Sequence, residues 1–335
     1  MLETSISPKR SSKSSCIQIS RRCSHGDSFA GGLDGSISTG VGGLPLALGI
    51  DERCHLKVGI FTYLTDYGPS PIDVGRAVEL HGFESLYVPE HTHIPAIGSS
   101  SWPGGGTLPR RNVRTLDPFI ALTAVASTTE RLRVGTCVSL VAQRDAIILA
   151  KEIGSLDRIA PGRFDLGVSP GWNAEEAANH GVTKHRTARM LETIEALRAI
   201  WAGDPAEFHG RFIDFDPIYS WPKPRGDVPI FVAGGGPTVL ERVLSHGDGW
   251  IPPRFPLSDL PAVSARIREL RDRAGEQGRE LSVTVYGAAN SAAGLEAYGS
   301  AGVDRVLLEL EDHGGDHAAA FRQLDDLARL LRDRR

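Results

Sequence analysis

From residue 57 onward, hydrophobic and polar positions follow a repeating pattern. Short runs rich in β-branched and other apolar residues alternate with longer amphipathic stretches, as in successive strand–helix units of a parallel sheet. The expected strands are residues 58–61, 85–88, 132–138, 163–168, 229–233, 249–251, 281–286 and 305–310. The expected helices are residues 71–81, 117–129, 145–159, 185–202, 237–246, 258–276, 292–300 and 316–332.

The number of these units predicts the fold class. Eight strands, each followed by a helix, form a closed (β/α)8 or TIM barrel. A doubly wound open sheet is the alternative, but its GxGxxG motif is missing from the first strand–helix turn, and the glycine cluster follows the fifth strand. We therefore expect one α/β barrel domain over residues 56–335 with long loops at 92–115 and 203–227. The first loop leaves the carboxyl end of a strand and is a candidate lid, whereas the second is expected to pack against the barrel.

Residues 1–55 differ from the rest of the chain, being rich first in Ser, Lys and Arg and then in Gly and Ser. They contain too few large apolar residues to offset the entropy of folding. The apolar run at 44–48 is too short, and too far from the start, for a signal peptide. We expect a disordered extension, or upstream sequence included through a mis-assigned start.

Composition narrows the possible partners. The 335-residue chain is 41% hydrophobic and 23% charged, with a formal net charge of −4, which is ordinary for a globular protein. Nothing in this charge favours a nucleic acid or a membrane as partner, and no apolar run approaches the length of a transmembrane helix. The four cysteines match no CxxC metal spacing, so reduced thiols in a cytoplasmic protein are expected.

Barrel enzymes carry their catalytic groups where the strands end, at the carboxyl side. This rule selects residues at or just after the carboxyl ends of the second, third, fourth and fifth expected strands. They are Glu90 and His91; Thr136, Cys137 and Val138; Ser169, Gly171, Trp172 and Asn173; and Gly234, Gly235 and Gly236.

The glycine run at 234–236 leads from a strand into a helix expected to begin at Pro237. Glycines let backbone N–H groups approach an anion, and a helix N-terminus favours negative charge. A phosphate site is therefore one interpretation, and a tight turn that requires glycine is the other. The second glycine-containing turn, at 167–171, strengthens the phosphate interpretation.

His91 and His93 could form a metal-binding pair, because alternate residues of a strand share a face. Such a site needs further ligands at later strand ends, where Ser169, Ala233 and Pro252 stand instead. We therefore expect no metal, and we assign His91 to catalysis.

Several longer segments together resemble the luciferase-like monooxygenases. They are LAKEIGSLDRI at 149–159, PGRFDLGVSPGW at 161–172, ERLRVGT at 130–136, FHG at 208–210, the Pro-x-Pro at 222–224 and DGW at 248–250. The resemblance covers residues 57–332, although Ala160-Pro161 and Ser169 depart from the usual pattern. The segment VPEHTHIP at 88–95 is more similar to the branch that uses the deazaflavin coenzyme F420 than to the FMN-using luciferases.

The resemblance implies roles for these residues. His91 is expected to face the reactive ring and to assist hydride or proton transfer, with Glu90 either orienting it or packing as a polar strand end. Glu175 and Glu176 are the other candidate acidic partners of His91. Cys137 and Val138 match the site of a non-proline cis peptide bond behind the flavin ring, so Cys137 is a backbone feature and not a nucleophile.

The resemblance also implies the cofactor contacts. The glycines at 234–236 would bind its phosphate. The ends of the third and fourth strands would contact it through Thr136, Cys137, Val138, Ser169, Gly171, Trp172 and Asn173, although core or lid packing is the alternative for Trp172. Arg110, Arg111 and Arg114 form a basic cluster for the phosphate or polyglutamate tail, or else a solvated loop face.

The resulting prediction is an oxidoreductase that transfers hydride between coenzyme F420 and a small organic substrate, and the resemblance implies a homodimer. The alternatives are an FMN-dependent monooxygenase that uses O2 and a non-catalytic flavin-binding barrel.

Overall fold

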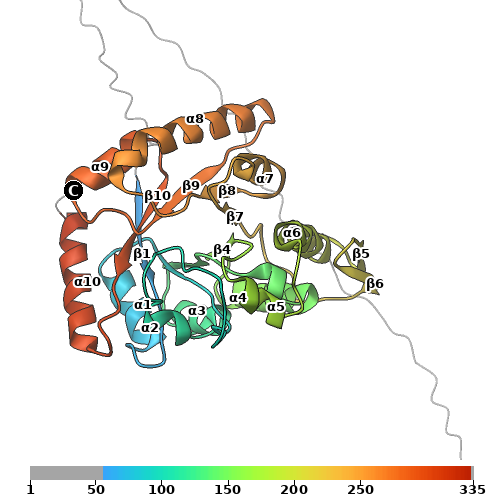
Figure 1. The fold of residues 1–335 in the computed structure, drawn as a ribbon, viewed down its shortest axis with the longest axis horizontal. Coiled ribbons are helices and arrows are strands. Elements are labelled where there is room, and N and C mark those ends of the chain that lie inside the picture. The colour runs from blue at the N-terminus through green and yellow to red at the C-terminus, as the bar shows by residue number, and fades with distance from the viewer. Residues whose placement is uncertain (1–55, 333–335) are drawn as a thin grey trace, which may run out of the picture. The chain divides into compact units, whose positions relative to one another are not determined.

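A computed structural model describes residues 56–332 of the chain, so the predicted N-terminal extension lies outside the described residues. Within them, eight parallel strands close into a barrel in the order β1-β10-β9-β8-β7-β4-β3-β2. The helices lie outside this ring of strands (Figure 1). The barrel confirms the predicted TIM-barrel fold.

The barrel strands are short, as is usual for this fold. They are β1 (Lys57–Thr62), β2 (Ser85–Val88), β3 (Arg133–Thr136), β4 (Phe164–Val168), β7 (Ile230–Ala233), β8 (Gly249–Ile251), β9 (Ser282–Tyr286) and β10 (Arg305–Leu310). The helices are α1 (Pro71–Leu80), α2 (Arg110–Val113), α3 (Pro118–Ser127), α4 (Ala146–Ile159), α5 (Ala174–Asn179), α6 (Arg186–Ala202), α7 (Val239–His246), α8 (Leu260–Glu276), α9 (Ala292–Ser300) and α10 (His317–Arg332). None of these helices is long and apolar enough to cross a membrane.

Local chemistry fixes where several of these helices begin. Ser70, Asp117 and Asp145 precede α1, α3 and α4, and each side chain accepts a hydrogen bond from a backbone N–H of the first turn. Pro71 and Pro118 occupy the first helical position, where the missing N–H costs nothing. These caps therefore set the residue at which α1, α3 and α4 begin.

Inside the barrel, the amino-terminal half is filled by a buried charged cluster. Arg305, at the start of β10, hydrogen-bonds to the Tyr87 hydroxyl and lies 3.2 Å from an Asp165 carboxylate oxygen. The Tyr87 hydroxyl donates to Asp165, and Arg133 also pairs with this carboxylate. Tyr87 and Asp165 are buried, at 0% and 1% exposed, so this cluster forms the floor beneath the barrel mouth.

The insertion at 203–227 contains an antiparallel hairpin, β5 (Ala206–His209) and β6 (Asp214–Ile218), which was expected as loop. Its strands are short and half exposed, so they carry no apolar run that could signal them. The segment after it packs on α4, because a Cβ on Gly154 would lie 2.3 Å from the Pro222 carbonyl oxygen. The insertion lines no part of the pocket described below, which agrees with the expected packing role.

Three other elements differ from the sequence prediction. The third barrel strand ends at Thr136 and not at residue 138, and the peptide bond between Cys137 and Val138 that follows it is cis. The short helices α2 and α5 were not predicted, since four and six residues are too few to show a helical period.

Candidate active site

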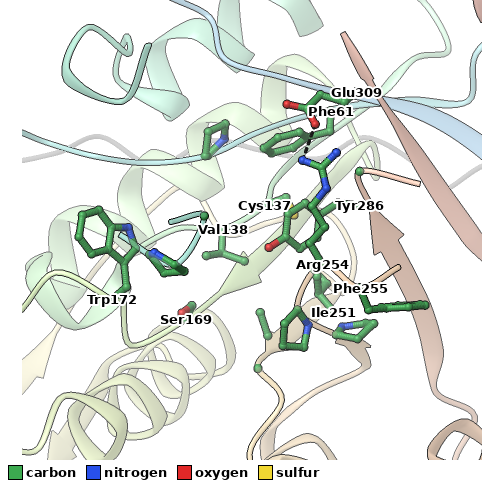
Figure 2. Close-up of a pocket in the computed structure, with 18 of the residues that line it drawn as sticks. Phe61, Cys137, Val138, Ser169, Trp172, Ile251, Arg254, Phe255, Tyr286 and Glu309 are labelled. Carbon is green, nitrogen blue, oxygen red and sulfur yellow. Dashed lines mark ion pairs between the residues drawn. The ribbon is translucent and has the colours of Figure 1, made fainter. Parts of the chain in front are cut away.

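A pocket of about 1020 Å³ lies at the carboxyl ends of the barrel strands. Its volume matches the upper range of ligand pockets. Much of its wall is aromatic, as in a site for a planar ligand, and Figure 2 shows several of these side chains. The aromatic lining residues are Phe61, Tyr63, Trp102, Trp172, Phe255, Tyr286 and Tyr298.

His91, which follows β2, is held at both ring nitrogens. Its Nδ1 lies 2.7 Å from Oε2 of Glu176, and its Nε2 accepts from the Trp172 indole N–H at 3.3 Å. The two rings meet edge to face, with centroids 5.6 Å apart. Because the indole can only donate, Nε2 carries the lone pair and Nδ1 carries the hydrogen that Glu176 accepts. His91 is therefore presented to the pocket with a defined tautomer.

Glu176 is the carboxylate that orients His91. Its side chain is 1% exposed, and its second oxygen accepts from the backbone N–H of Thr92 at 3.0 Å. Asn173 caps α5, the helix that carries Glu176, through a 2.9 Å hydrogen bond to the Glu176 N–H. Asn173 thus acts on the helix and does not line the pocket, where a cofactor contact had been expected.

Glu90 points away from His91, since neighbouring residues of an extended chain face opposite sides. Its buried carboxylate accepts from Ser139 Oγ at 2.6 Å, from the Leu140 N–H at 2.8 Å and from Arg144 Nε at 2.8 Å. Glu90 was expected either to orient His91 or to pack as a polar strand end. Its contacts favour the second role. These hydrogen bonds hold the chain at Ser139 and Leu140, immediately after the cis peptide bond.

The peptide bond between Cys137 and Val138 is cis, as the family resemblance implied. Both residues line the pocket, and Figure 2 places Val138 near its centre. Burial raises the pKa of the Cys137 thiol far above its ordinary value, so the group is a neutral thiol at neutral pH. This agrees with the expectation that Cys137 contributes its backbone.

In the glycine turn after β7, all three carbonyl oxygens accept hydrogen bonds from side chains of neighbouring elements. Gly234 (φ 146°) accepts from the Trp250 indole at 2.9 Å, and Gly235 and Gly236 accept from Arg266 at 2.9 and 3.1 Å. The N–H groups of Gly235 and Gly236 have no acceptor among the hydrogen bonds of residues 56–332. A Cβ on Gly235 would lie 2.6 Å from the Pro253 ring. The turn therefore offers free donors in front of α7, which suits a phosphate.

The remaining predicted contacts divide into two groups. Ser169 and Gly171 line the pocket, and the Ser169 hydroxyl accepts from the Gly171 N–H at 3.1 Å. Thr136 does not line it, because its hydroxyl is buried against the Gly167 carbonyl at 2.8 Å. Of the three glycines in the turn after β7, Gly234 reaches the pocket wall.

His93 turns away from His91. Its ring nitrogens lie 2.8 Å from the Asn179 amide and 2.9 Å from the Thr92 hydroxyl. In the described part of the chain, no group of three His, Cys, Asp or Glu side chains is arranged to hold a metal ion.

The three arginines of the expected basic cluster are separated in the structure. Arg110 stacks over the Tyr67 ring at 4.3 Å, and Arg114 pairs with Asp66. Arg111 alone lines the pocket.

The loop at 92–115 covers part of the pocket with Trp102. Its first part is tied to α5, because Glu175 accepts from the Ser99 N–H at 2.7 Å and from the Ser100 hydroxyl. Hydrogen bonds from Ser100 and Ser99 lower the pKa of Glu175 to about 2. The expected lid is thus held by one ionised carboxylate.

The chain is similar to known proteins in both sequence and structure. Residues 69–325 match the family model described as luciferase-like monooxygenase. An uncharacterized protein of Mycobacterium tuberculosis is 36% identical over 278 residues, which cover 79% of this chain and 96% of that protein. An F420-dependent glucose-6-phosphate dehydrogenase of Nocardia farcinica is 30% identical over 209 residues, which cover 58% of this chain and 56% of that protein.

Two solved structures show the same fold. An F420-dependent secondary alcohol dehydrogenase in complex with an F420–acetone adduct has a TM-score of 0.61 and 17% identity, covering 82% of this chain and 99% of that chain. The oxygenating constituent of 3,6-diketocamphane monooxygenase from Pseudomonas putida, in complex with FMN, has a TM-score of 0.61 and 15% identity, covering 82% and 98%.

Proposed function

Because the chain belongs to the luciferase-like monooxygenase family, we propose that it is an oxidoreductase that transfers hydride between coenzyme F420 and a small organic substrate. One observation carries this proposal. His91, fixed by Glu176, lines the same pocket as Val138 and Gly234, which follow the strands β3 and β7. The F420-dependent relative at 30% identity supports this coenzyme, whereas the FMN-bound monooxygenase shares the fold alone.

The residues of the pocket fit a flavin-like cofactor. Beside Gly234, which lines the pocket, the N–H groups of Gly235 and Gly236 are free for a phosphate, and Val138 offers a surface for a planar ring. The pocket volume leaves room for a second molecule beside the ring. When bound, coenzyme F420 supplies the carbon that accepts or gives the hydride.

The chain itself handles the proton that accompanies the hydride. Loss of hydride from a carbon that bears a hydroxyl or amine leaves a proton to be removed, and Nε2 of His91 is a base placed in the pocket to take it. Glu176 holds the Nδ1 hydrogen and stabilises the imidazolium that forms. The Trp172 indole occupies Nε2 beforehand and must give way to the substrate. Trp102 on the loop above helps to exclude water.

The first experiment is a pair of fluorescence titrations of the full chain, one with coenzyme F420 and one with FMN. Binding of F420 at micromolar concentration or below, with FMN at least tenfold weaker, supports the proposal. Preference for FMN would replace it with the O2-using monooxygenase. Binding of neither would leave the non-catalytic barrel as the better account.

A pair of histidine variants then tests the catalytic role. We expect His91→Ala to keep its affinity for the cofactor and to lose about 10²- to 10⁴-fold in turnover, the range of general acid–base catalysis. His93→Ala is the matched control, because His93 lies two residues away and turns to Asn179. Equal turnover in the two variants would remove His91 from the mechanism.

A further inference from the structure

We propose that Arg111 and Arg254, joined by Glu309, recognise an acidic group of the organic substrate, a carboxylate or a phosphate. This inference rests on the proposed function only in treating the pocket as the substrate site. These three charged side chains line one wall of the pocket, and the catalytic machinery does not use them.

The position of Glu309 follows from the pattern of β10. Arg305, Leu307 and Glu309 alternate along this strand, so they share its inward face. Arg305 belongs to the floor of the barrel, and Glu309 is near the mouth, where it is only 8% exposed. A carboxylate this deeply buried requires partners.

Each oxygen of Glu309 receives one guanidinium. Arg111, from α2, places Nη2 3.2 Å from Oε1, and Arg254, from the loop after β8, places Nη1 2.6 Å from Oε2. Two elements distant in sequence are thereby brought to one point, and Figure 2 shows the pair formed by Arg254. Glu309 is a positioning residue for both guanidinium groups.

This group of three carries one net positive charge and unused hydrogen-bond donors. A guanidinium has five N–H donors, and the ion pairs engage one nitrogen of each arginine. Within residues 56–332, neither guanidinium forms another ion pair or side-chain hydrogen bond. The planar fork of N–H groups matches the paired oxygens of a carboxylate or phosphate.

A buried amide beside them gives independent evidence of a ligand. Asn112 is 2% exposed and lines the pocket, yet its Oδ1 has no hydrogen-bond partner in the described structure. An unpaired buried acceptor costs free energy, so such a group usually meets a ligand or water. A hydroxyl or N–H of the same substrate would satisfy it.

The surroundings strengthen an ionic contact. Arg111 stacks over the Tyr63 ring at 4.5 Å, and Phe61 packs against both Tyr63 and Tyr286. Burial raises the pKa of Tyr63 and raises that of Tyr286 to about 12, so both remain neutral phenols at neutral pH. Neutral aromatic neighbours lower the local dielectric and add no competing anion.

The placement also explains how an acid would be oriented. Figure 2 shows Trp172 on one side of the pocket, Arg254 and Glu309 on the other, and Val138 between them. A substrate anchored by its acidic end at the arginines would extend its other end toward His91, on the side of the pocket where Trp172 lies. The acidic group would thus serve for binding and orientation, and the reacting carbon would lie elsewhere in the substrate.

The test compares acids with a neutral analogue by isothermal titration calorimetry. trans-Cinnamate and phenyl phosphate are the acidic probes, and cinnamamide is the neutral one. With the cofactor-loaded full chain, we expect at least one acid to bind tenfold to a hundredfold tighter than the amide, the range for bonds to charged groups. The better acid identifies the anionic group. Equal affinity for all three probes would overturn the proposal.

Variants assign the preference to these residues. Arg254→Gln changes a half-exposed loop residue, so the fold is expected to survive, and the preference for the acid should fall at least tenfold. Arg254→Lys keeps the charge and should retain part of it. Arg110→Gln is the matched control, because Arg110 lies on the same helix as Arg111 but stacks on Tyr67 outside the pocket. An undiminished acid preference in Arg254→Gln would overturn the assignment.

The same titrations separate this proposal from the proposed function. Cofactor affinity should change less than twofold in Arg254→Gln, and a larger loss would assign Arg254 to the cofactor instead. The acid preference is measured on the cofactor-free protein as well. If coenzyme F420 fails to bind but the acid preference persists, the hydride-transfer proposal fails and the anion site stands.

Discussion

Replacing Glu176 by glutamine tests how the pocket fixes its histidine, because the change keeps the shape of the side chain and removes its charge. The carboxylate is 1% exposed and accepts one hydrogen bond from His91 Nδ1 and another from the Thr92 N–H. Glutamine has one oxygen to offer these two donors. One of them must then face the new NH2 group.

The magnitude follows from these contacts. A hydrogen bond to a charged group contributes about 1.5–3 kcal/mol, and an unpaired buried donor adds a similar penalty. Removal of the buried charge recovers part of this loss. We therefore expect the free energy of unfolding of Glu176→Gln to fall by about 2 kcal/mol. If the amide NH2 faces Nδ1, the His91 hydrogen moves to Nε2 and opposes the Trp172 indole.

Two measurements check this expectation, namely urea unfolding followed by circular dichroism and the histidine tautomer followed by 15N NMR. The wild type should show His91 with its hydrogen on Nδ1, and the variant should show a changed tautomer or a mixture. Glu175→Gln is the matched control, since Glu175 is the preceding residue of α5 and bonds to the loop instead. An unchanged tautomer together with unchanged stability would refute the assignment of Glu176.

Two further predictions concern the barrel and its lid. Gly167→Ala should destabilise the fold by about 3 kcal/mol in urea unfolding, because the new Cβ would lie 2.1 Å from the Thr136 carbonyl oxygen, whereas Gly275→Ala meets nothing within 4 Å and should be harmless. The lowered pKa of Glu175, about 2, means that its contacts with the loop persist above the ordinary carboxyl pKa and weaken only as pH falls toward 2. Hydrogen exchange of residues 97–107, corrected for the intrinsic rate, should therefore be equally slow at pH 5 and pH 8 and faster in Glu175→Ala.

The sequence predicted the barrel well because each strand–helix unit carries its own signal. The strand at 305–310 is apolar except for Arg305 and Glu309, and the helix after it has a clear apolar stripe. The β5–β6 hairpin has no such signal, since most of its side chains are exposed. Short half-buried elements depend on the neighbours they pack against, which a sequence does not display.

The candidate site was predicted in part, and the difference has a physical cause. His91 could be found because it follows a strand directly, and the strand ends of a barrel meet at one face. Its partner was undecided among Glu90, Glu175 and Glu176, because the choice depends on which way each side chain points. Glu309 could have been suspected, since a carboxylate on the inward face of a buried strand is unusual. Arg254 carries no such signal.

The charged floor formed by Arg305, Tyr87 and Asp165 has a kinetic consequence. These side chains close the barrel from below, so two molecules that share the pocket would both enter and leave on the side of the strand ends. The molecule that lies deeper has to arrive first and depart last, because the other blocks its path. The order in which ligands come and go is therefore set by residues that neither of them contacts.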